Sequence, residues 1–239
     1  MGGRLSMDEK WTFSFRKHPM FTGLPVDMEG AETRLVAALA DPHGNHQRVR
    51  LDLIRYYRSM RRPADVLAVA TDYLAKTSDT EARAEVYFHL GQAMERVGDW
   101  ESAVRWYSQA MELRPRSVCY RYLIHNNIGY SLNQQGRFVD AEDFLRKAIS
   151  INPQRANAFK NLGLSLEGQG RLGEAVRSYV ASIQADAADP RALVHLEELL
   201  ERNAFVRDEI PDFGHQIRMC RRAVEYAISR NRRCRPAQV

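Results

Sequence analysis

The sequence predicts an all-α protein, an α-solenoid of antiparallel helix pairs with flanking helices. The main observation is an order of small residues that recurs between residues 84 and 189. Gly129 recurs 34 residues later as Gly163, which is the period of a helix-turn-helix repeat. Gly91 precedes Gly129 by 38 residues. We therefore expect about four extra residues, relative to that period, in the loop that contains Arg116 to Cys119.

Each repeated residue type has a physical role in this pattern. A glycine inside a helix costs about 1 kcal/mol relative to alanine, so Gly91, Gly129 and Gly163 predict close approach of a neighbouring helix. The matching small residues on the second helix of each unit are Ala103, Ala141 and Ala175. The larger residues expected to fill the remaining space are Tyr107, Leu145 and Tyr179. A further set stands where each first helix must end in a left-handed cap, namely Gly98, Gly136 and Gly170.

These motifs resemble the tetratricopeptide repeat (TPR) family, with units at 84–117, 122–155 and 156–189. The resemblance implies a right-handed solenoid in which the first helix of each unit lines a concave groove. It also implies a non-catalytic scaffold or adaptor that binds an extended peptide or a helix of a partner protein. Carried over position by position, the expected groove residues are Phe88, His89, Gln92, Asn126, Asn127, Tyr130, Asn133, Asn157, Lys160 and Asn161.

The predicted groove is rich in primary amides, which both donate and accept hydrogen bonds and can pair with the backbone of an extended peptide. A competing interpretation is that Asn127 and Asn161 only satisfy local polar groups. The groove is also open to occupation by another part of the chain, and a partner can use the convex side instead. The lysines and arginines of the two-carboxylate clamp of chaperone-binding TPR proteins are absent from the matching positions, although Lys160 remains able to bind one carboxylate.

The flanking regions complete the domain organisation. Residues 1–30 form an irregular arm that contains Trp11, Phe13, Phe15 and Phe21. This arm either caps the first helices, lies in a TPR groove or is disordered. Apolar periodicity predicts helices at 31–40, 46–60 and 64–76, so residues 31–80 are a degenerate repeat or an unrelated helical hairpin. Capping helices at 190–230 and a basic tail at 231–239 follow. Self-association through the solenoid ends and the aromatic arm is a further expectation.

Positive charge is concentrated at the C-terminus. From residue 213 onward there are seven arginines and one acid, Glu225, a net charge of +6. Because the whole chain carries +5, residues 1–212 sum to −1. The alternative function is therefore association with nucleic acid or an anionic membrane through Arg218–Arg235, which salt would weaken steeply. In this segment Tyr226 is the one aromatic residue on which a nucleic-acid base can stack.

No catalytic motif accompanies these features. The sequence has no GxxxxGK, GxGxxG, HExxH or GxSxG pattern, so we expect neither an enzyme nor a cofactor. Cys119, Cys220 and Cys234 are widely separated, without metal-ligand spacing, and predict a reducing, cytoplasmic environment. Two loop histidines, His43 and His46, lack a third ligand nearby, so no metal site is expected.

Overall fold

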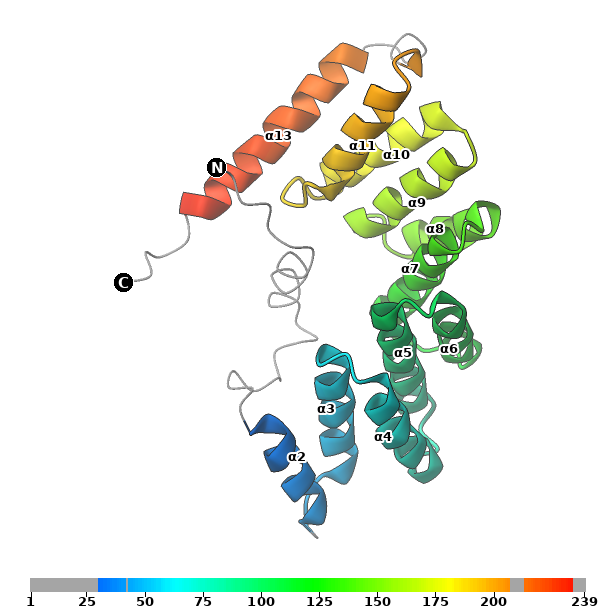
Figure 1. Cartoon of the computed structure of the whole chain (residues 1–239), viewed down its shortest axis with the longest axis vertical. Helices are drawn as coiled ribbons and strands as arrows, with labels where there is room; N and C mark the ends of the chain where they lie inside the picture. The colour runs from blue at the N-terminus through cyan, green and yellow to red at the C-terminus, as the bar shows by residue number, and fades with distance from the viewer. Residues whose placement is uncertain (1–29, 42, 207–212, 234–239) are drawn as a thin grey trace. The chain divides into compact units, whose positions relative to one another are not determined.

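The computed structural model describes residues 30–41, 43–206 and 213–233. Within these ranges every regular element is an α-helix (Figure 1). The predicted aromatic arm, except for Gly30, lies outside the described residues, as do residues 234–239 of the basic tail. The chain divides into two compact units, residues 1–78 and 79–239, which are described separately.

The first unit contains α2 (Ala31–Ala40), α3 (His46–Ser59) and α4 (Pro63–Lys76). The Asn45 side chain caps α3 by accepting a hydrogen bond from the Arg48 backbone N–H at 3.0 Å. Proline at the first position of α4 suits a helix start because that N–H has no intrahelical partner. The buried residues on α3 and α4 are Leu53, Ile54, Tyr56, Tyr57, Arg58, Val66, Ala70 and Tyr73. Met60, which follows the end of α3 at Ser59, is 48% exposed.

The second unit is a succession of antiparallel helices. In order they are α5 (Thr80–Val97), α6 (Trp100–Glu112), α7 (Val118–Gln134), α8 (Phe138–Ile151), α9 (Ala156–Gly168), α10 (Leu172–Ala185), α11 (Arg191–Arg202) and α13 (Phe213–Arg233). Among the helices of both units in the described ranges, none combines the length and apolarity needed to cross a lipid bilayer. Nor do the described residues bring together three or more side chains of the types that ligate metals.

The turn inside each pair depends on a glycine in the left-handed region. Gly98 ends α5 with φ of 79°, and its N–H bonds to the carbonyl of Glu95. Gly136 and Gly170 adopt the same conformation after α7 and α9. This confirms the predicted left-handed caps. Asp99 then caps α6 by accepting a hydrogen bond from the Ser102 N–H, so the reversal takes few residues.

The extra residues between Gly91 and Gly129 do not lengthen the loop as expected. Helix α7 already begins at Val118, so they extend α7 at its N-terminal end. The Ser117 hydroxyl caps that extension by accepting a hydrogen bond from the Tyr120 N–H at 3.3 Å. The cap satisfies a backbone donor at the helix start, so these residues add to the helix rather than to the loop.

Close approach of paired helices explains the internal glycines, as predicted. A Cβ added at Gly91 would lie 2.5 Å from the Tyr107 ring. A Cβ at Gly163 would lie equally close to the Tyr179 ring. Both tyrosines are fully buried, and Leu145 fills the matching place against Gly129. Each glycine therefore admits a large side chain from the second helix of its pair.

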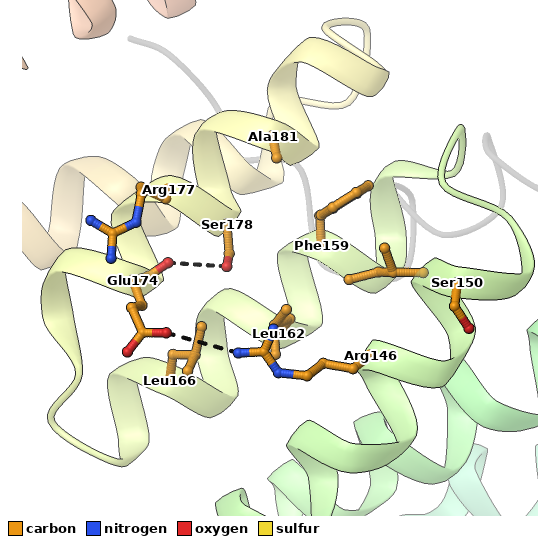
Figure 2. A pocket seen from close by; sticks show the side chains of 10 residues that line it. Arg146, Ser150, Phe159, Leu162, Leu166, Glu174, Arg177, Ser178 and Ala181 are labelled. Carbon is orange, nitrogen blue, oxygen red and sulfur yellow. Dashed lines mark hydrogen bonds and ion pairs between the residues drawn. The ribbon is translucent and has the colours of Figure 1, made fainter.

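The helix pairs form two layers of unequal spacing. Neighbouring first helices α5, α7, α9 and α11 contact one another in series. The second helices lie farther apart. Between α8 and α10 this separation leaves a cleft of about 410 Å³, with α9 as its floor (Figure 2). Leu162 and Leu166 of α9 lie along that cleft. The layer of first helices is thus the shorter, concave side of the curved stack.

The stack ends with α11 and α13. Helix α11 packs on α9 and α10 through buried leucines, including Leu196 and Leu199. Helix α13 covers α10 and α11 with the buried residues Ile217, Cys220 and Val224.

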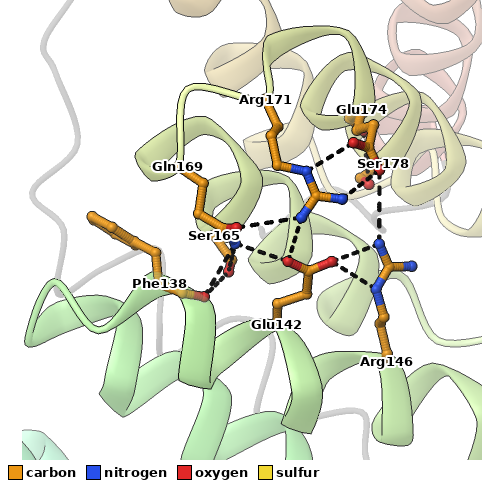
Figure 3. A network of polar contacts seen from close by, with 8 residues as sticks. All are labelled: Phe138, Glu142, Arg146, Ser165, Gln169, Arg171, Glu174 and Ser178. Carbon is orange, nitrogen blue, oxygen red and sulfur yellow. Dashed lines mark hydrogen bonds and ion pairs between the residues drawn. The ribbon is translucent and has the colours of Figure 1, made fainter.

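A polar network links the second and third helix-pair repeats, residues 122–155 and 156–189 (Figure 3). Glu142 of α8 accepts hydrogen bonds from Arg171 at 2.6 Å, Gln169 at 2.9 Å and Arg146 at 2.8 Å. Burial raises the pKa of Glu142, but the hydrogen bonds from Gln169 and Arg146 and the positive charges of Arg146 and Arg171 outweigh it. The pKa of this carboxyl is therefore lowered. The network joins α8 to the turn between α9 and α10.

Replacing Glu142 with glutamine is expected to lower the free energy of unfolding by about 1 to 2 kcal/mol at neutral pH, because two arginines lose a largely buried partner. The lowered pKa means that this stabilisation is present above the ordinary pKa of 4.5. It is lost as the pH falls through the folded-state pKa. Urea unfolding from neutral to acidic pH measures the difference between variant and wild type.

Asp140→Asn is the matched control on the same helix. Its partner Arg137 is 55% exposed and Asp140 itself 51%, so the change should be within about 0.5 kcal/mol. Equal effects of the two substitutions would contradict a structural role for the Glu142 network.

Candidate peptide-binding surface

The concave layer contains all ten residues that the sequence predicted for the groove, but it exposes them unequally. Four retain at least partial exposure, namely Gln92, Asn127, Tyr130 and Asn157. Six are buried, namely Phe88, His89, Asn126, Asn133, Lys160 and Asn161. A ligand on this surface therefore meets fewer of these side chains than the sequence suggested.

Phe88 requires a correction. It is 1% exposed, and its ring lies 5.7 Å from Tyr107 and 5.5 Å from Tyr120. Aromatic packing of this kind belongs to the hydrophobic core. Phe88 is thus no aromatic contact for a ligand, and Tyr130 is the aromatic residue of the predicted set that remains accessible.

The buried amides form a chain of hydrogen bonds across three helices. Asn161 of α9 donates to the Asn126 side-chain oxygen at 3.1 Å. Asn126 donates to Asn127 at 3.0 Å, and Asn127 donates to the Tyr107 hydroxyl at 3.1 Å. Asn133 adds a bond to the Asn161 carbonyl at 2.8 Å. These amides fix α6, α7 and α9 in register, which favours the local interpretation over a ladder that pairs with a peptide backbone.

His89 is also committed to the fold. Its Nδ1 lies 3.2 Å from the Gln92 side-chain oxygen, and its Nε2 lies 3.5 Å from Glu85. The ring is 3% exposed. His89 therefore orients neighbours on α5 instead of presenting a nitrogen to the surface.

Lys160 has a different environment. Its side chain is 8% exposed, and it forms no ion pair with a carboxylate in the described ranges. Burial, together with the positive charge of Arg191, lowers the pKa of Lys160 to about 8. The negative charge of Asp189 opposes this shift only in part. A buried ammonium that no ion pair neutralises is energetically costly, and at neutral pH Lys160 is such a charge on the concave layer.

Two further residues near Lys160 come from α11. Arg191 pairs with Asp189 at 2.8 Å and donates to the Asn157 side chain at 3.0 Å. His195 stacks on Tyr179 with ring centroids 5.9 Å apart. Burial and the positive charge of Lys160 lower the pKa of His195. The surface around Lys160 therefore combines its ammonium with an ion-paired arginine and with a histidine whose charged form is disfavoured.

The sequence prediction of the groove omitted Arg191 and His195 because α11 has no repeat glycine. The period itself contains the missing signal: Arg191 follows Asn157 by 34 residues, and His195 follows Asn161 by 34. A prediction of groove residues from the 34-residue period alone, without requiring a repeat glycine, would have included Arg191 and His195.

Tyr130 connects this region to α5. Its ring makes an edge-on contact with Trp100 of α6 at 5.7 Å, and Glu95 is the α5 residue that acts on it electrostatically. Burial, and then the negative charge of Glu95, raises the pKa of the Tyr130 hydroxyl, while Arg191 acts in the opposite direction. Tyr130, Lys160 and Arg191 thus place an aromatic ring and two cations on the layer formed by α7, α9 and α11.

The fold and this surface define a helical repeat scaffold whose accessible chemistry suits binding of another protein. Models of the tetratricopeptide repeat match residues 84–117 and 122–155. Photosystem I assembly protein Ycf3 of Acaryochloris marina is 30% identical over 142 residues, with 51% of this chain and 81% of the relative covered. The chain belongs to the tetratricopeptide repeat family.

Other comparisons agree with the fold. Human Tetratricopeptide repeat protein 7B is 29% identical over 105 residues, which is 44% of this chain but 12% of that protein. The chain thus spans only a small part of the length of this relative. A solved structure of a MamA RS-1 ArsTM double mutant aligns with a TM-score of 0.58 at 18% identity, with 75% of this chain and 97% of that chain covered. At that identity the likeness concerns the fold alone.

Proposed function

We propose that residues 79–206 form a non-catalytic scaffold whose concave layer binds an extended segment of a partner protein. An acidic group of that segment pairs with Lys160. The observation that carries this proposal is the buried Lys160 ammonium, which forms no ion pair in the described ranges although Asp189 is near enough to act on it electrostatically. The name of the Acaryochloris marina relative, an assembly protein, supports a role in holding protein partners.

The chemistry of the ligand follows from the surface. A carboxylate that reaches Lys160 gains a charge-assisted hydrogen bond and removes the cost of an unpaired buried charge. Arg191 is already paired with Asp189, so its charge is largely compensated and Lys160 is the cation that remains for the ligand. Asn157, one helical turn before Lys160, and Tyr130, which lies near Arg191, are contacts for neighbouring parts of the segment. We therefore expect selection for one acidic group rather than for general negative charge.

The test compares two peptide libraries of about 12 residues, a length that spans several extended-peptide subsites. One carries glutamate and the other glutamine at a central position, and both have blocked termini and no other acid. Retention on the immobilised full-length protein should favour glutamate by about tenfold or more, the size of one charge-assisted hydrogen bond. Lys160→Met should abolish the preference.

Lys147→Met is the matched control, because Lys147 is an exposed lysine of α8 beside Phe144 and should leave the preference intact. Raising the pH to about 9 should weaken retention of the glutamate library by about tenfold, since Lys160 must be protonated to bind. Equal retention of the two libraries by the wild-type protein, or a preference unchanged in Lys160→Met, would reject the proposed site.

A further inference from the structure

Helix α13 has a second face that the concave surface does not involve. Its apolar stripe is buried against α10 and α11, with Ile217 at 6%, Cys220 at 5% and Val224 at 3% exposure. The opposite side is open along most of the described helix. A helix that is anchored on one side presents the side chains of its other face in a fixed order.

Four residues on the open side recur at intervals of four, namely Arg218, Arg222, Tyr226 and Arg230. We call them the basic ridge. At a rise of about 1.5 Å per residue they extend over roughly 18 Å. Tyr226 is 69% exposed. The three arginines form no ion pair within the described residues, whereas Arg221, outside the ridge, pairs with Glu197 at 2.6 Å.

Charge complementarity identifies the kind of ligand. Glu225 is the one acid in α13, so arginines outnumber acids along the helix that carries the ridge. Arginines spaced along a helix suit a chain of phosphates. An exposed tyrosine between two arginines supplies a platform on which a base can stack. Membrane insertion is disfavoured because the apolar stripe of α13 is already buried in the core.

We infer that the basic ridge binds single-stranded nucleic acid, with phosphates on Arg218, Arg222 and Arg230 and one base stacked on Tyr226. This site is separate from the proposed peptide-binding surface and does not depend on it. Recognition of this kind tolerates any base sequence, because every base has a stacking face.

The probe is a fluorescein-labelled RNA of about 20 uridines, long enough for one stacking site and its flanking phosphates. Fluorescence anisotropy with the full-length protein measures the affinity between about 50 and 300 mM salt. The triple variant Arg218→Gln/Arg222→Gln/Arg230→Gln should reduce the slope of log affinity against log salt by about 2, at about 0.7 per phosphate. Tyr226→Ala should weaken binding by about fivefold or more, and Tyr226→Phe should not.

A control of equal charge is Arg105→Gln/Arg137→Gln/Arg177→Gln, because these exposed arginines lie on or next to α6, α8 and α10. It should bind the RNA like the wild type. The proposal is overturned if the wild type does not bind, if both triple variants lose the same affinity, or if Tyr226→Ala has no effect. Tighter binding to vesicles of phosphatidylcholine with about one third phosphatidylserine than to the RNA would likewise overturn it in favour of a membrane surface.

Discussion

Lys160→Met should raise the free energy of unfolding by about 3 kcal/mol at neutral pH. Burial lowers the pKa of Lys160 from 10.5 to about 8, and each pKa unit corresponds to about 1.4 kcal/mol. Methionine keeps the length of the side chain without the buried charge, so the folded state no longer carries that cost. Chemical denaturation of the two proteins at pH 7 measures the difference.

The pH dependence separates this cause from improved packing. The folded-state pKa of Lys160 lies below the unfolded-state value, so the unfolded chain binds more protons between about pH 8 and 10.5. Wild-type stability at this site therefore rises with pH over that window, and the advantage of Lys160→Met shrinks. Lys147→Met should show neither effect, because Lys147 is exposed. A destabilised Lys160→Met protein would contradict the unpaired-charge interpretation.

Together with the loss of glutamate selection proposed above, this result would describe a residue that costs stability and contributes binding. Such residues are expected at functional sites, where activity opposes stability. A variant that gains stability and retains the preference for glutamate would place the ligand elsewhere on the concave layer.

Gly163→Ala should lower the free energy of unfolding by about 2 kcal/mol, although alanine is the better helix former. The new Cβ would lie 2.5 Å from the ring of Tyr179. This ring cannot withdraw easily, because its hydroxyl donates to Glu167 at 2.8 Å and its face stacks on His195. Overpacking of about 3 kcal/mol is offset by about 1 kcal/mol of helix propensity.

Gly173→Ala is the control for Gly163→Ala, and it should have the opposite sign. A Cβ at Gly173 of α10 meets only the end of the flexible Arg177 side chain, at 3.8 Å. Stability should therefore rise by up to about 1 kcal/mol. Thermal unfolding of both variants tests the pair, and a stabilised Gly163→Ala protein would show that the helices of this unit separate without cost.

Much of the fold was predictable because its signals are local. Gly98 marks a left-handed turn, and Gly163 marks a close contact, whichever residues surround them. The length of α7 was not predictable in this way. Its start at Val118 depends on the hydrogen bond from the Tyr120 N–H to Ser117, and a serine at the end of a loop has the same sequence signal in many other settings.

The candidate site was predictable in position but not in chemistry. Spacing correctly placed Lys160 and Asn161 on the same layer. It also predicted that both side chains face a ligand, and this does not distinguish their different environments. The structure shows that Asn161 is engaged by Asn126 and that Lys160 forms no ion pair in the described ranges. Arg191 was omitted because the search followed glycines, and α11 has none at the repeat position.

By itself, the sequence determined the repeat period, the helix pairs and the concentration of arginines near the C-terminus, because these depend on residue type and spacing along the chain. Only the tertiary structure decided which polar groups satisfy one another and which remain for a ligand. Burial and pairing depend on neighbours far apart in the sequence, as in the Asn127–Tyr107 and Asn161–Asn126 contacts, which join residues 20 and 35 positions apart. The unpaired ammonium of Lys160 is a property of that packing and of no local pattern.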